Sequence, residues 1–208
     1  MKLLVDVDAV AKLAHWNLLD ALPLLTKVPF AQCATLSSAK YRAQRAAENP
    51  DGKLFHSKHA ASAAIAAIRG MTASIDSIET LLPVLQDLPG IDAGEAVLLS
   101  AAANSESIRL LTGDKRALRA LSQLPLESRA GFAGKIIVIE QVLIAALSQF
   151  GIDELRKRVC PHKDLDKAVG IAMGSKCDAP ESSVREGLNS YINEIAQACA
   201  PSLLAKFS

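Results

Sequence analysis

Three short apolar runs constrain the fold of this chain more than any other feature. Lys2–Asp6, Ile108–Thr112 and Lys135–Ile139 each have the composition of a buried strand, and helical sequence lies between them. Strands that alternate with helices pair in parallel through right-handed crossovers, which place helices on both faces of the sheet. We therefore expect an α/β protein with three layers, α/β/α, around a central parallel sheet.

The end of the chain has a different character. From Gly151 to Ser208 no strand is predicted, and Ser183–Ala198 has the spacing of an amphipathic helix. With 208 residues, of which 50% are hydrophobic, the chain can form one domain with a full core and an appendage. We expect an α/β domain over residues 1–150 and a helical extension, 151–208, packed against it.

Turn residues and helical spacing predict the remaining elements. Asp8 is expected to cap the first helix and Pro23 to help end it. A weak edge strand is expected around Val28. The predicted helices are Ala9–Leu22, Gln32–Ala47, His56–Ile68, Asp76–Gln86 and Gln141–Phe150, and the edge strand is Thr26–Phe30.

Charge and aromatic content exclude some functions. The 23 basic and 22 acidic residues give a net charge of +1, so any polyanion must contact a local patch. Aromatic residues form only 4% of the chain, and single-strand binders that work by base stacking need more exposed rings than this chain can easily spare.

The cysteines and the N-terminus both favour the cytoplasm. Four cysteines without a CxxC pair are typical of buried residues or free thiols in a reducing compartment, and Cys160 and Cys177 lack a recognisable metal-site spacing. Asp6 and Asp8 interrupt any signal-peptide apolar region. No apolar run is long enough to cross a membrane.

Acidic residues gather where the predicted strands and helices meet. Asp6 ends the first strand, with Asp8 nearby, and Asp114 follows the second strand. Asp92 and Glu95 lie at the start of the helix before that second strand. A helix in a parallel unit runs opposite to the next strand, so its start lies at the strand's carboxyl end. This edge is where open α/β sheets bind ligands.

Each acid also has an ordinary structural interpretation. Asp92 and Glu95 fit a capping box, Asp114 and Asp8 could each cap a helix, and Asp6 could accept backbone hydrogen bonds. Taken together, however, several carboxylates at one edge repel each other unless a cation lies between them. Mg²⁺ or Mn²⁺ is the usual solution, because these ions prefer oxygen ligands.

A divalent ion among carboxylates can activate water and stabilise a phosphodiester transition state. The expected contacts to phosphate or RNA are Thr112, Lys115, Arg116 and Arg119. The three cations follow Asp114 at a helix start and suit a phosphate group. The alternative for these cations is a solvated helix face.

The segments LLVDVDAV, IDAGEAVLLSAAA and IRLLTGDKRAL resemble the PIN-domain nucleases. The resemblance covers about residues 2–140. It matches Asp6, Glu95 and Asp114 to the family's acids and Thr112 to the threonine two residues before the last of them. It implies a divalent metal and a nuclease of RNA or other nucleic acid, and it puts Asp8 in the place of a polar Asn or Ser. From the geometry of the sheet edge, we expect Asp8 and Asp92 at the rim of the metal site. Many members are toxins, so an antitoxin is an implied partner; a homodimer is a further expectation.

One family feature has no clear match. The family usually has another acid on a helix after its second strand, but Ser37, Ser38 and Lys40 occupy that neighbourhood here. The nearest acid is Glu48, which also has the placement of a surface residue before a turn.

Three hypotheses follow. The first is a metal-dependent ribonuclease. The second is a PIN-like module that lost a ligand and serves as a binding or regulatory partner. The third, more distant, is a phosphatase of the haloacid-dehalogenase type, because LLVDVDAV resembles its nucleophile motif, with Asp6 as nucleophile and Asp8 as acid/base. The Gly-Thr of that motif is replaced by Ala9–Val10.

Overall fold

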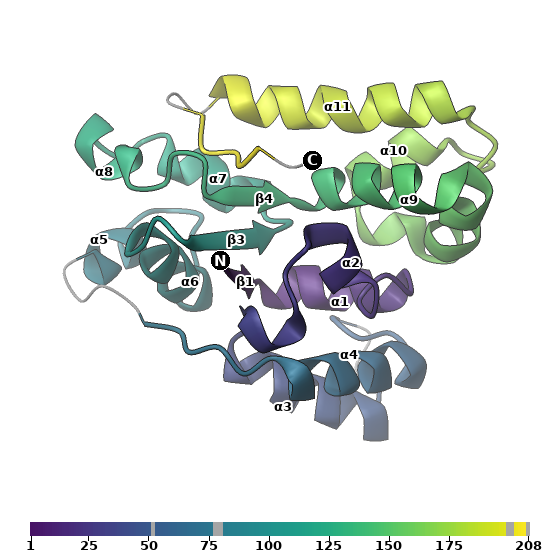
Figure 1. Ribbon diagram of the computed structural model, residues 1–208, viewed down its shortest axis with the longest axis horizontal. Helices are drawn as coiled ribbons and strands as arrows, with labels where there is room; N and C mark the ends of the chain where they lie inside the picture. The colour runs from purple at the N-terminus through teal and green to yellow at the C-terminus, as the bar shows by residue number, and fades with distance from the viewer. Residues whose placement is uncertain (51–52, 77–80, 199–201, 207–208) are drawn as a thin grey trace.

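The protein is built on a parallel sheet of four short strands (Figure 1). The computed structural model describes residues 1–50, 53–76, 81–198 and 202–206. The strands are β1 (Lys2–Val5), β2 (Cys33–Ala34), β3 (Ile108–Thr112) and β4 (Ile136–Val138), in the order β2-β1-β3-β4. The three strands predicted from the sequence are therefore parallel neighbours, as expected.

Helices cover both faces of this sheet. In β1, Leu3 and Val5 belong to one buried cluster and Leu4 belongs to another, because successive side chains of a strand point to opposite faces. Both faces are thus apolar, which explains why the strand sequences are nearly continuous hydrophobic runs. The layered α/β architecture predicted from the sequence is confirmed at this level.

The remaining elements are helices, which lie between the strands and after the last one. The α-helices are α1 (Val7–His15), α2 (Leu22–Thr26), α3 (Ser37–Glu48), α4 (Lys58–Gly70), α5 (Leu82–Gln86), α6 (Ala93–Ala103), α7 (Lys115–Leu121), α8 (Leu126–Ala130), α9 (Ile139–Val159), α10 (Lys167–Met173) and α11 (Glu181–Ala198), with 3₁₀ turns η1 (Phe30–Gln32) and η2 (Cys160–Leu165).

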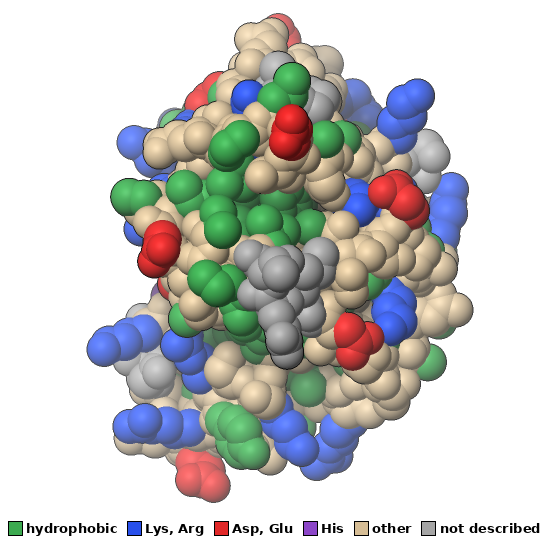
Figure 2. All heavy atoms as spheres, turned by 90° about the vertical axis from the view of Figure 1, so that its left-hand side faces the viewer, with side chains coloured by type: hydrophobic (Ala, Val, Ile, Leu, Met, Phe, Trp, Pro, Cys, Tyr) green, Lys and Arg blue, Asp and Glu red, His purple; other side chains and the backbone are tan. Residues whose placement is uncertain are grey.

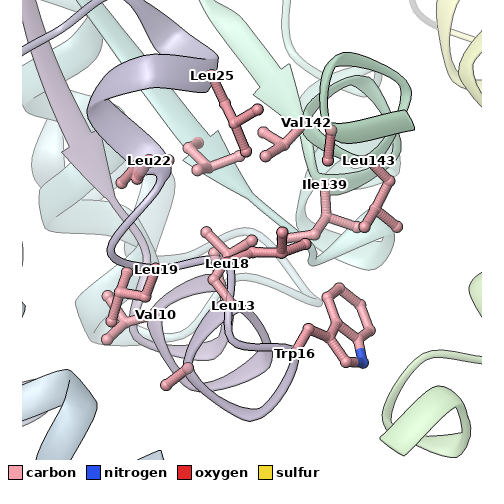
Figure 3. Close-up of a cluster of buried hydrophobic side chains, with 14 of the residues drawn as sticks. Val10, Leu13, Trp16, Leu18, Leu19, Leu22, Leu25, Ile139, Val142 and Leu143 are labelled. Atoms are coloured by element: carbon pink, nitrogen blue, oxygen red, sulfur yellow. The ribbon is translucent and has the colours of Figure 1, made fainter. Parts of the chain in front are cut away.

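Figure 3 shows part of the core between α1, α2 and α9. Leu13 and Trp16, from α1 and its C-cap, face Ile139 and Leu143 of α9, and all four are buried. The Trp16 indole donates a hydrogen bond to the backbone carbonyl of His162, 3.0 Å away. Residues near the N-terminus therefore pack directly against the last third of the chain.

Several elements near the N-terminus differ from their predicted form. Asp6, not Asp8, caps the first helix, which ends at His15 rather than Leu22. Pro23 is the second residue of α2, a position where its missing N–H does no harm, so it opens a helix instead of ending one. The expected edge strand Thr26–Phe30 is wrong: Lys27 has a left-handed φ of 58° that breaks it.

Other boundaries shift by a few residues. The second and third predicted helices begin later, at Ser37 and at Lys58, where Ser57 is the N-cap. The predicted helix Asp76–Gln86 includes residues 77–80, outside the described part of the chain, and α5 begins at Leu82.

The C-terminal segment is mostly helical and shares the core of the sheet. Val184 and Leu188 of α11 join the cluster on one face, and Ile195 joins the other. Gly151, with a φ of 78°, interrupts α9 at the predicted start of the extension. Contrary to the prediction, this segment also pairs with the sheet: Leu204 forms a parallel bridge to Ile136.

The expectation that all cysteines are unpaired is wrong. Cys160 and Cys177 form a disulfide across a sequence separation of 17. The sequence spacing hides this pair, because α10 folds back between the two cysteines and brings their Cα atoms to 6.2 Å. Cys33 is free and buried, as predicted, and Cys199 lies outside the described residues. The reducing-compartment argument therefore loses its support.

In the part of the chain that the structure describes, no helix combines the length and apolarity that crossing a bilayer requires.

The packing of the C-terminal tail against the core predicts how much one of its side chains contributes to stability. Leu203 is fully buried in the second cluster, whereas Leu204 beside it is half-buried. We expect Leu203→Ala to lower the free energy of unfolding by about 3 kcal/mol, because it leaves a cavity. Leu204→Ala, the matched control, should have a clearly smaller effect. Urea unfolding followed by circular dichroism measures both, and an effect of Leu203→Ala no larger than its control contradicts the described packing of the tail.

Candidate functional site

The sheet's carboxyl edge carries a pocket lined by five carboxylates, which we call the acidic pocket. Its volume is about 510 Å³. The acids come from the end of β1 and the start of α1, from the start of α6, and from the start of α7. The pocket is lined by Asp6, Val7, Asp8, Leu36, Ser38, Arg42, Leu54, Asp92, Ala93, Gly94, Glu95, Asp114 and Arg116.

Asp6 lies deepest and is connected to the neighbouring strand. It is 7% exposed, and its Oδ1 accepts a hydrogen bond from the Val7 amide at 2.7 Å. Its Oδ2 accepts one from Thr112 Oγ1 at 3.3 Å. The same hydroxyl accepts the Asp114 amide at 3.1 Å. Thr112 therefore fixes the relative positions of two acids and is itself buried.

Asp92 and Glu95 form the capping box that their spacing predicts. The Glu95 amide donates to Asp92 Oδ1, and the Asp92 amide donates to Glu95 Oε2, each at 2.8 Å. This arrangement fixes the Glu95 side chain against the start of α6. The capping and pocket-lining interpretations of these residues are thus both correct.

Asp114 combines a helix cap with an ion pair. Its Oδ1 accepts from the amides of Arg116 and Ala117, and its Oδ2 accepts from the Arg116 guanidinium at 2.9 Å. Arg116 is mostly exposed, with 81% of its side chain accessible. It therefore covers one side of Asp114 from the solvent-exposed surface.

Burial and mutual repulsion set the protonation of these acids. Burial raises the pKa of Asp6 to about 6, and the negative charge of Asp8 adds to the rise. Burial likewise raises the pKa of Glu95 to about 7, with further contributions from Asp114 and Asp92. The apolar side chains of Leu98, Leu99 and Leu118 form part of the wall beneath Asp6 and Glu95, which explains the loss of hydration.

The pKa of Asp114 shifts in the opposite direction. Burial disfavours the charge of Asp114, but the hydrogen bonds from Arg116 and the backbone amides outweigh it, so its pKa lies below the ordinary value. The nearby Asp114 carboxylate contributes to the raised pKa of Glu95, so Glu95 is the acid of this pair that takes up a proton first as the pH falls.

Asp8 is held at the rim by Lys12, whose side chain is largely buried. Lys12 Nζ lies 2.8 Å from Asp8 and 2.9 Å from Asp166, which caps α10. Burial acts against the Lys12 charge, but these two carboxylates hold its pKa above the usual value. Asp8 is thus partly neutralised, and the C-terminal segment reaches the edge of the acidic pocket through Asp166.

The predicted phosphate-contacting residues are not all brought together. Arg116 lines the pocket, whereas Lys115 lies 2.5 Å from the fully buried Glu140 and over the ring of Tyr191. In the described structure neither carboxylate oxygen of Glu140 accepts a hydrogen bond. The ion pair with Lys115 therefore compensates for the burial of the Glu140 charge. Arg119 pairs with Glu194 on α11.

Ser38 and Arg42 line the pocket from α3. The sequence predicted no pocket role for either: Ser38 was expected only in the neighbourhood of the missing acid, and Arg42 was not singled out. Glu48, at the far end of α3, is exposed and does not line the pocket. A helical projection from Ser38 would have found Arg42 four residues on, but only the fold shows which face meets the acids.

The donor set suits a hydrated ion better than a closed chelate. Among the described residues, no three His, Cys, Asp or Glu side chains converge closely enough to hold one ion directly. Mg²⁺ keeps several waters and needs only one or two carboxylates. Asp6 and Glu95 are desolvated acids that take part in no ion pair with a described Lys or Arg, so added positive charge would stabilise their ionised forms.

Comparisons with known proteins do not assign the chain to a family. No family model matches it, and neither does any curated protein or solved structure. The resemblance to PIN-domain nucleases therefore rests on the three sequence motifs.

The raised pKa of Asp6 predicts a pH-dependent stability in metal-free protein. Protonated Asp6 favours folding, so its contribution is fully present below the unfolded value near 3.8 and is lost as pH rises through about 6. Asp6→Asn stays neutral and can still accept the Val7 amide. We expect it to raise the free energy of unfolding at pH 8 by on the order of 2 kcal/mol, with little change at pH 4.

Asp114→Asn is the matched control, because the pKa of Asp114 is lowered and its charge is favourable. Urea unfolding in EDTA at both pH values measures each variant. A gain in stability at pH 8 for Asp114→Asn, or a loss for Asp6→Asn, would contradict this description of the pocket.

Proposed function

We propose that this protein is a divalent-metal-dependent nuclease that hydrolyses phosphodiester bonds in RNA. The observation that carries the proposal is the convergence of five carboxylates with Arg42 and Arg116 in one pocket at the carboxyl edge of a parallel sheet. Carboxylates suit Mg²⁺ or Mn²⁺, and guanidinium groups suit phosphate. The pocket can therefore accommodate both an ion and the anion on which it would act.

Asp6, Glu95 and Asp114 are the residues that would hold the ion, with Asp8 and Asp92 at the rim. When bound, the ion supplies charge stabilisation and an activated water for hydrolysis. The protein supplies position: Thr112 fixes Asp6 and Asp114, and the capping box fixes Glu95. Rigid placement of this kind is what metal-assisted hydrolysis requires.

The two arginines would orient the scissile phosphate. Arg116, whose side chain is largely exposed, would exchange its ion pair with the half-buried Asp114 for a contact with a phosphate oxygen. Arg42, across the pocket on α3, has no carboxylate partner among the described residues and is available without such an exchange.

One observation favours a second function. Ser38 and Arg42 occupy the place where the family has an acid, so the pocket has one carboxylate fewer and one cation more than the resemblance implies. A PIN-like module with this change could bind nucleic acid through its arginines without cleaving it. The expected antitoxin, the homodimer, the cytoplasmic location and the phosphatase hypothesis stay untested predictions.

Metal binding and RNA cleavage distinguish the two functions. We expect calorimetry to detect Mn²⁺ binding to the wild type and single-stranded RNA to be cleaved only when Mn²⁺ or Mg²⁺ is present. Asp6→Asn and Asp114→Asn should each reduce cleavage by more than about 100-fold, since losing a ligand exceeds the roughly 10–100-fold effect of losing its support.

Asp153→Asn is the matched control, because Asp153 is an exposed acid on α9 outside the pocket. It should cleave RNA like the wild type. Equal cleavage by the two pocket variants would place the active site elsewhere. Nucleic-acid binding without metal uptake or cleavage would favour the non-catalytic module.

A further inference from the structure

The outer face of α3 continues the acidic pocket along the molecular surface. Residues three, four and seven positions apart share a helix face, so Ser38, Tyr41, Arg42 and Arg45 lie together. The first and third of these belong to the pocket. The opposite face is built from small buried residues, Ala39, Ala43 and Ala46. The inner face is thus committed to packing, and the outer face is left to solvent.

This outer face is basic and its cations are uncompensated. Arg42 and Arg45 are exposed, and neither forms an ion pair with a carboxylate in the described part of the chain. The half-buried arginines of the C-terminal helices differ, because Arg156, Arg158 and Arg185 each pair with an acid on their own helix. Figure 2 shows Lys and Arg side chains gathered at the lower end of the molecule, where α3 lies in Figure 1.

An aromatic ring lies among these cations. Tyr41 is 68% exposed, which is the largest exposed fraction among the large hydrophobic side chains in the part of the chain that the structure describes. The chain has only two tyrosines, and the other, Tyr191, is covered by Lys115. A largely exposed ring, beside two guanidinium groups that form no ion pair with a described carboxylate, has the chemistry of a site for a nucleic-acid base and its phosphates.

We propose that the outer face of α3 binds a single-stranded segment of nucleic acid and leads it into the acidic pocket. Tyr41 stacks on one base, and Arg45 contacts a phosphate next to the one held at Arg42. The two arginines are ~4.5 Å apart along the helix axis, within reach of successive phosphates for such long side chains. This inference rests on the proposed nuclease function, and it specifies unpaired strands as the substrate class.

The low aromatic content of the chain is compatible with this role. One exposed ring can stack with one base, and the remaining affinity must come from phosphate contacts. Binding should therefore be strongly salt-dependent and tolerant of sequence. A base in an intact duplex is already stacked and its face is not available to Tyr41, so a duplex should bind more weakly.

The test measures binding separately from cleavage. Fluorescence anisotropy in EDTA would follow a fluorescein-labelled, single-stranded 2′-O-methyl oligoribonucleotide of mixed sequence, over a series of salt concentrations. We expect Tyr41→Ala to weaken binding about tenfold and Tyr41→Phe, which keeps the ring, to restore it. Arg45→Ala should lower the slope of log K against log salt by about 0.7, the value for one phosphate of a single strand.

Lys176→Ala, which removes an exposed positive charge from the loop after α10, is the matched control and should bind like the wild type. Equal binding by Tyr41→Ala and the wild type, equal binding of single strand and duplex, or no binding at low salt overturns the inference. Binding that depends on Tyr41 while all RNA stays uncleaved supports the α3 site and rejects the nuclease. Metal-dependent cleavage with no effect of Tyr41 or Arg45 rejects the α3 site alone.

Discussion

The parallel pairing of β1 with β3 is the constraint on which the rest of the site depends. Val5 lies opposite Leu111, and the amide of Asp6 donates to the carbonyl of Leu111 at 2.9 Å. This register puts the end of β1 beside Thr112, whose hydroxyl then contacts both Asp6 and Asp114. A shift of one residue would reverse the faces of β1 and remove Asp6 from the pocket. The register thus determines the acid positions.

Helix capping explains how the fold tolerates this gathering of charge. Asp6, Asp92 and Asp114 each accept hydrogen bonds from amides at a helix start, which favours their charged forms. Capping cannot satisfy every oxygen, and Asp6 and Glu95 keep raised pKa values because they are buried beside other acids. The same geometry that stabilises three helices therefore leaves a local excess of negative charge. We interpret that excess as the binding energy available to a cation.

The sequence predicted the parts of this arrangement that depend on local patterns. The buried strands, the Asp92–Glu95 capping box and the shared edge of the acids follow from periodicity and the crossover rule. The role of α3 does not, because only tertiary packing decides which face of an alanine-rich helix is buried. The Cys160–Cys177 disulfide and the Lys12–Asp166 ion pair were not predicted either. In both, the partners are separated in the sequence and are brought together only by the tertiary fold. The prediction for Pro23 was wrong because proline is favoured in the first turn of a helix, where its missing N–H does no harm.

The most direct test of this account is the anomalous scattering of Mn²⁺ in crystals of the wild-type protein. The account predicts one or two peaks in the acidic pocket, each in contact with carboxylate oxygens of Asp6, Glu95 or Asp114, and displacement of Arg116 from Asp114. Crystals of Asp6→Asn grown in the same solution should lose or weaken the peaks. An empty pocket at saturating Mn²⁺, or peaks confined to acids outside it, would contradict the claim that these carboxylates form a metal site.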